Sequence, residues 1–99
     1  MEKEKPTESK NKNDVTVCVK YGSQQTSREF NTNQTVGFVR QKVLVDEWRI
    51  DKAVADGLQI HLEVPGGTSI PLQAAQHLRD VPLKPDRCIV FEPTPQPYG

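Results

Sequence analysis

The sequence predicts an α+β fold, in which a mixed sheet of four to five strands packs on one α-helix. Segments that alternate apolar and polar residues lie on both sides of a segment with helical spacing, and a continuous apolar run lies near the C-terminal end. The predicted order is hairpin, helix, hairpin, short turn and last strand. The 99 residues, of which 34% are hydrophobic and 26% charged, correspond to one small domain.

The first hairpin is indicated by residues 15–21, in which apolar β-branched residues alternate with polar ones. The turn begins at Gly22, and residues 27–31 form the returning strand. Phe30 is the best core candidate of that strand, although Arg28 interrupts its alternation.

The helix is predicted to begin near Asn33 or Thr35, because either side chain can accept a hydrogen bond from an amide of the first turn. It should span about 13 residues and end near Trp48. Val36, Val39, Val43 and Glu47 fall at helical spacing, and the solvent side carries Arg40, Gln41 and Asp46.

A second hairpin follows the helix. Residues 58–63 alternate strictly, residues 65–67 supply a Pro-Gly-Gly reversal, and residues 69–72 form a short returning strand. Residues 78–83 are too short and too Pro-interrupted for a long helix, and we expect one 3₁₀ turn there. The apolar run 88–91 is typical of a central strand.

Two segments without strand or helix patterns flank the predicted domain, residues 14–92. Residues 1–13 carry many charges and no apolar residue after the first, so we expect a disordered tail. Residues 93–99 contain three prolines, which lack an amide donor, and we expect this segment to be extended and to leave the sheet.

Composition argues against several classes of function. The 13 basic and 13 acidic side chains balance, so the chain lacks the excess positive charge that attracts nucleic acid. No segment approaches the roughly 20 apolar residues of a membrane span, and the N-terminus lacks the apolar core of a signal peptide. We expect a cytoplasmic protein with no nucleic-acid or membrane partner. The absence of metal-ligand and phosphate-loop spacings predicts neither metal nor cofactor.

The order of elements resembles that of the ubiquitin family, whose fold is the β-grasp. The resemblance covers almost the whole predicted domain and is carried by VTVCVKYG, TVGFVRQKV, LQIHLEVPGG and LRDVPLKPDRCIVFE. It implies that the first and last strands are parallel neighbours at the centre of the sheet. Ras-binding domains and sulfur-carrier proteins share this order, so the fold alone does not decide the function.

The same resemblance implies a function for Gly99, because ubiquitin-like modifiers are conjugated to lysine amines through a C-terminal glycine. The partners would then be activating and conjugating enzymes, a deconjugating protease and target proteins. The tail departs from the family, since Tyr98 precedes a lone glycine and no arginine is present. We expect Pro97 and Tyr98 to be read by the enzymes of a divergent or bacterial conjugation system.

The two cysteines fall on the strands that the resemblance makes central neighbours. A catalytic thiol at Cys18 or Cys88 would need a base, and the histidines, His61 and His77, are the obvious candidates. Nothing in the sequence places an orienting carboxylate beside them. We therefore expect two reduced cysteines and no enzymatic activity.

A non-covalent interaction domain is the alternative function. If Ile89 faces the helix, then the outward residues of the predicted strands form a candidate interaction surface, namely Lys20, His61, Cys88 and Val90. A one-residue shift of the last strand would reverse which of its residues face outward. A Ras-type binding module would instead use Lys20 and Arg28 on the exposed edge of the second strand.

Overall fold

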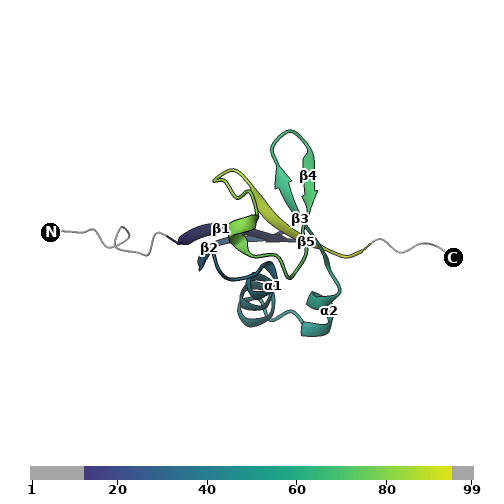
Figure 1. Cartoon of the computed structure of the whole chain (residues 1–99). Coiled ribbons are helices and arrows are strands. Elements are labelled where there is room, and N and C mark those ends of the chain that lie inside the picture. Colours follow the sequence, from purple (N-terminus) through teal and green to yellow (C-terminus); the bar gives the residue numbers. More distant parts are fainter. Residues whose placement is uncertain (1–12, 95–99) are drawn as a thin grey trace.

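The computed structural model describes residues 13–94 (Figure 1). Five strands, two short α-helices, a π-helical segment and a 3₁₀ turn follow one another along this part of the chain. In order they are β1 (Asp14–Tyr21), β2 (Gln24–Asn31), α1 (Val36–Arg40), η1 (Gln41–Glu47), α2 (Lys52–Asp56), β3 (Gln59–Val64), β4 (Thr68–Pro71), η2 (Leu78–Asp80) and β5 (Cys88–Glu92).

The strands form one mixed sheet in the order β2-β1-β5-β3-β4. β1 and β5 are parallel, while the pairs β1–β2, β3–β4 and β3–β5 are antiparallel. The predicted α+β class is confirmed, as is the parallel pairing of the first and last strands. Figure 1 shows α1 and α2 on the same side of the sheet.

The core lies between the sheet and the helices. Strand residues alternate between this core and the opposite face, as the pleat of a strand requires. In β5, Ile89 and Phe91 are fully buried, so the last strand has the predicted register without a shift. The other large residues that are fully buried are Val17, Val19, Val36, Val39, Val43, Leu44, Leu62 and Leu78.

α1 and η1 form the predicted helix without interruption from Val36 to Glu47. Thr35 caps the N-terminus, since its Oγ1 accepts a hydrogen bond from the amide of Phe38 at 3.1 Å. The second half is π-helical, which the spacing of apolar residues did not predict. It ends at Trp48, whose amide donates to the carbonyl of Val43 at 2.9 Å.

Two elements differ from expectation. β2 begins at Gln24 rather than at residue 27, because its first half is an exposed edge with no apolar alternation to reveal it. The short helix α2 was not predicted, since five residues are too few for a helical pattern. The Asp51 side chain caps it by accepting from the Ala53 amide at 2.8 Å, and Ala55 packs into the core.

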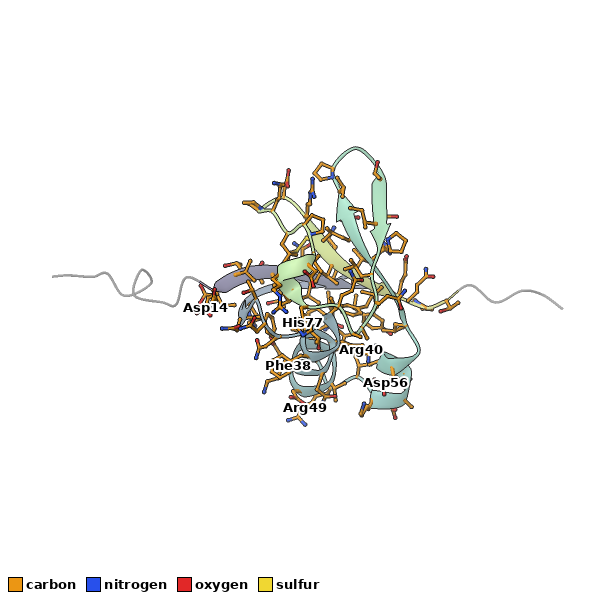
Figure 2. The ribbon with its side chains drawn as sticks, viewed as in Figure 1. Asp14, Phe38, Arg40, Arg49, Asp56 and His77 are labelled. Atoms are coloured by element: carbon orange, nitrogen blue, oxygen red, sulfur yellow. A yellow bond between two sulfur atoms is a disulfide. The ribbon has the colours of Figure 1, made fainter. Side chains whose placement is uncertain are left out.

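An ion pair between Asp56 and Arg40 links α2 to α1, and a second pair joins Asp56 to Lys52 within α2 (Figure 2). The Asp56 carboxylate lies 2.8 Å from Lys52 Nζ and 3.2 Å from Arg40 Nη2. The hydrogen bond from Lys52 lowers the pKa of Asp56 below its usual value of 3.8, and the charges of Lys52 and Arg40 act in the same direction. In the part of the chain that the structure describes, no helix has the length and apolar character of a membrane span.

Candidate functional site

The face of the sheet opposite the helices, here called the outer face, carries the predicted interaction surface. Its side chains come from alternate positions of the strands, between residues that are buried in the core. The central three strands contribute Thr16, Cys18 and Lys20 from β1, Cys88, Val90 and Glu92 from β5, and Gln59, His61 and Glu63 from β3.

The strand register brings the four predicted residues together. Val90 of β5 lies opposite Lys20 of β1 on one side and opposite His61 of β3 on the other. Cys88 lies two positions before Val90 on the same face. All four side chains are half-buried, and Val90 is the apolar centre of the group.

Carboxylates of β3 and β5 contact the basic side chains of this surface. Lys20 Nζ lies 2.7 Å from Glu63 Oε1, and His61 Nδ1 lies 3.3 Å from Glu92 Oε2. Gln59 Nε2 donates to the same Glu92 oxygen at 3.3 Å. The interaction surface therefore includes two glutamates that sequence reasoning left out, because their partners become evident only from the strand register.

The expectation of two reduced cysteines is wrong, because Cys18 and Cys88 form a disulfide. The two residues are direct partners in the β1–β5 register, and both side chains point to the outer face. Their Cα atoms lie 4.5 Å apart, within the range that a disulfide spans. The parallel pairing of these strands, combined with their alternation, was the signal that could have revealed the bond.

The basic edge that a Ras-type module would use is not formed by Lys20 and Arg28. Lys20 belongs to β1, which has β2 on one side and β5 on the other, so it is not at an edge. Arg28 is on the edge strand, but it lies opposite Val17 and so projects to the helix side. There it forms a two-point ion pair with Glu47 at the end of η1.

The C-terminal residues predicted for conjugation, Pro97, Tyr98 and Gly99, lie outside the described residues. The structure does describe where the chain leaves the sheet. β5 ends at Glu92, and the next two residues, Pro93 and Thr94, are exposed. Thr94 Oγ1 donates a hydrogen bond of 3.4 Å to the carbonyl of Gly57 at the end of α2.

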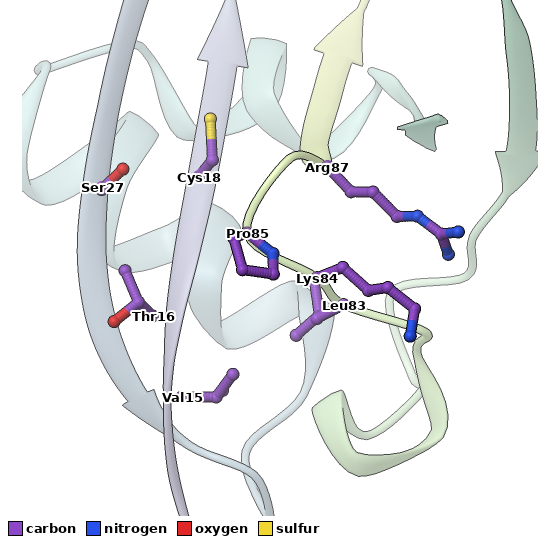
Figure 3. Close-up of a pocket in the computed structure, with 8 residues that line it drawn as sticks. All are labelled: Val15, Thr16, Cys18, Ser27, Leu83, Lys84, Pro85 and Arg87. Carbon is purple, nitrogen blue, oxygen red and sulfur yellow. The ribbon is translucent and has the colours of Figure 1, made fainter. Parts of the chain in front are cut away.

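A cavity of about 410 Å³ lies beside Cys18 (Figure 3). Val15, Thr16 and Cys18 of β1 form one wall, Ser27 of β2 extends that wall, and the loop of residues 83–87 forms the other. Sequence reasoning missed this cavity, because only the fold brings the loop over β1. Within residues 13–94, no group of three or more His, Cys, Asp or Glu side chains is arranged to hold a metal ion.

No protein-family model matches the sequence, and no curated protein matches it. Solved structures do. The C-terminal ubiquitin-like domain of mouse tubulin-specific chaperone e matches with a TM-score of 0.64 and 17% identity, covering 92% of this chain and 98% of that one. The ubiquitin-like domain of an Arabidopsis thaliana protein matches with a TM-score of 0.55 and 19% identity, covering 80% of this chain and 76% of that one.

This chain has the ubiquitin-like β-grasp fold. The structural matches confirm at the level of the fold the resemblance that the order of elements predicted. They carry over no binding site, because only 17% and 19% of the residues are identical. What the ubiquitin-like domain does must therefore be argued from its own outer face and from the segment that follows β5.

Proposed function

We propose that this ubiquitin-like domain is a protein modifier, which partner enzymes conjugate to lysine amines through Gly99. The observation that supports the proposal best is the exit of the chain from the fold. β5 is the central strand, and the chain leaves it at Pro93 and Thr94, both of which are exposed. At Thr94 the described part of the chain is therefore at the surface of the ubiquitin-like domain.

The chemistry of conjugation belongs to the partners. An activating enzyme transfers AMP from ATP to the Gly99 carboxylate and releases pyrophosphate, and a cysteine thiol then displaces AMP to form a thioester. A lysine amine displaces the thiol and forms the isopeptide bond. Glycine suits this role because it has no Cβ to obstruct narrow active sites. The side chains of Pro97 and Tyr98 and the outer face supply recognition.

The experiment that tests the proposal compares the chain ending in Gly99 with a variant that lacks Gly99. Each is incubated with ATP in lysate of the organism from which the sequence comes. Mass spectrometry then searches for lysine residues that carry the C-terminal segment as a branch. We expect branched peptides from the first protein and none from the variant.

A variant that lacks Glu2 serves as the control, since it loses one residue at the other end. It should form the same branched peptides as the unaltered chain. Conjugates that persist without Gly99, or their absence from all three reactions, would contradict the modifier proposal.

A non-covalent interaction domain is the second candidate function. One observation favours it: the mouse neighbour is named as the C-terminal ubiquitin-like domain of a chaperone, and so as a part of a larger protein. In this case partners dock on the outer face, and loss of Gly99 leaves binding unchanged. Val90→Asp, which places a charge at the apolar centre of the outer face, should weaken binding.

We also propose a cytoplasmic location, where conjugating enzymes and ATP are present. Disulfides are uncommon there because the glutathione and thioredoxin systems keep thiols reduced. The Cys18–Cys88 bond would then exchange with cellular thiols. Alkylation of free thiols in intact cells, followed by peptide mapping, would measure the fraction of the protein that is oxidised.

A further inference from the structure

Four residues form a row across the outer face, one from each of four adjacent strands. Ser27 of β2 lies opposite Cys18 of β1, Cys18 opposite Cys88 of β5, and Cys88 opposite Glu63 of β3. The disulfide therefore bridges the two middle positions of the row. A small hydroxyl residue flanks it on one side, and a carboxylate flanks it on the other.

The two sulfur atoms differ in how a nucleophile can reach them. A thiolate displaces a disulfide sulfur along the line of the sulfur–sulfur bond, so the side from which it comes decides which sulfur it attacks. Cys18 is attacked from the side of β2, where Ser27 is small and exposed. Cys88 is attacked from the side of β3, where Glu63 and its ion-pair partner Lys20 obstruct the approach.

The cavity borders Cys18, the end of the disulfide nearer to β2 (Figure 3). Both Cys18 and Ser27 line it, whereas Cys88 does not. Its loop wall is tied together, since the Arg87 amide donates to the carbonyl of Lys84 at 3.0 Å and Arg87 Nη1 donates to the carbonyl of Pro82 at 2.9 Å. A volume of about 410 Å³ is within the range of small-molecule sites.

We propose that the Cys18–Cys88 disulfide is a site of modification by small thiols, and that the thiol attacks Sγ of Cys18 from this cavity. The thiolate forms a new sulfur–sulfur bond to Cys18, the Cys18–Cys88 bond breaks, and its electron pair leaves on Sγ of Cys88. The products are a mixed disulfide at Cys18 and a thiolate at Cys88, which solvent protonates. Atoms and electrons balance with the thiol as the only co-reactant.

This reaction changes the outer face, whatever the function of the domain. It places an adduct on β1 and a free thiol on β5, next to Val90 and opposite Glu63. It also removes the covalent link between the first and last strands. Partner binding at the outer face then depends on the thiol state of the protein.

The test uses the full chain in its oxidised form and 2-mercaptoethanol as the probe. Samples are quenched with acid at early times, since the Cys88 thiolate can otherwise attack the mixed disulfide and move the adduct. Digestion at acid pH and mass spectrometry then locate the adduct. We expect it on Cys18 in large excess over Cys88 in the folded protein, and on both cysteines similarly in concentrated urea.

Three variants test the two sides of the row. Ser27→Tyr fills the side from which Cys18 is attacked and should slow adduct formation several-fold. Gln25→Tyr is the matched control, because it lies two positions away on the same strand and face, opposite Lys20, and does not line the cavity. It should leave the rate unchanged. Glu63→Ala removes the side chain and the ion pair that obstruct the β3 side and should increase the share of adduct on Cys88.

The proposal is overturned if the folded protein gives adduct mainly on Cys88 or gives the same distribution as the urea-unfolded chain. It is also overturned if Ser27→Tyr and Gln25→Tyr react at the same rate. Because the distribution and the rates are measured without conjugating enzymes, these results are independent of the test of Gly99.

Discussion

Arg49 is the one non-glycine residue with a positive φ among residues 13–94, at 61°. It stands where the helix ends, between the amide of Trp48, which donates to Val43, and the amide of Ile50, which donates to the carbonyl of Leu44 at 2.8 Å. These bonds resemble those with which helices end on a left-handed residue, a position that glycine usually occupies. The left-handed backbone at this exposed arginine therefore has an energetic cost that it would not have at glycine.

We expect Arg49→Gly to stabilise the domain. Relief of the left-handed conformation exceeds the extra freedom that glycine has in the unfolded chain, so the free energy of unfolding should rise by about 0.5–1 kcal/mol. Urea unfolding followed by circular dichroism measures the change. Arg49→Ala is the control, since it removes the same side chain and keeps the Cβ. Equal stability of the two variants would show that the backbone conformation is not the cause.

At the scale of the element, local sequence pattern predicts the strands and the main helix. It does not predict which strands lie side by side or which of their residues make contact. The alternation of residues 15–21 predicts a strand with Val17 and Val19 inward, and the structure confirms it. The disulfide and the Lys20–Glu63 pair depend on which strand lies beside β1 and in which register. Residues 70 and 43 positions apart in the sequence make these contacts, so local pattern could not reveal them.

The short helix α2 is another element that local sequence pattern could not predict. It has one fully buried residue, Ala55, and is held by the Asp51 cap and by the ion pairs of Asp56. A cap and two ion pairs are individually weak, so no strong signal in the sequence marks this helix. Its attachment to α1 should instead be visible in the pH dependence of stability.

We expect the Asp56 contribution to disappear in acid. The pKa of Asp56 is lower in the folded protein than its usual 3.8, so the ionised carboxylate stabilises the fold above that pH. The contribution is lost as the pH falls through the lowered folded pKa. Asp56→Asn should therefore be less stable than the unaltered chain at neutral pH and equally stable at about pH 2, as measured by urea unfolding.

Lys52→Met tests the cause of this pH dependence. It removes the hydrogen bond that lowers the pKa of Asp56 most, and should shrink the difference that Asp56→Asn makes at neutral pH. A loss of stability from Asp56→Asn that is as large in acid as at neutral pH would contradict the assignment.

At the scale of the whole molecule, the disulfide joins the two ends of the described fold. β1 is its first strand and β5 its last, and the bond closes a loop over a sequence separation of 70. A domain of about 80 residues has a small core and a correspondingly small margin of stability. The stabilisation that one disulfide provides by closing a loop of this length is therefore comparable with the whole free energy of unfolding.

Reduction of the Cys18–Cys88 bond should lower the free energy of unfolding by about 4 kcal/mol, because the open unfolded chain regains the entropy of a loop of this length. Urea unfolding of the oxidised and reduced protein measures the difference. A Cys18→Ser, Cys88→Ser variant is the control, since it should unfold like the reduced protein and should not respond to reductant. If the oxidised and reduced proteins unfold at the same urea concentration, then packing alone holds β1 beside β5. Thiol exchange at Cys18 would in that case change the chemistry of the outer face without changing the stability of the domain.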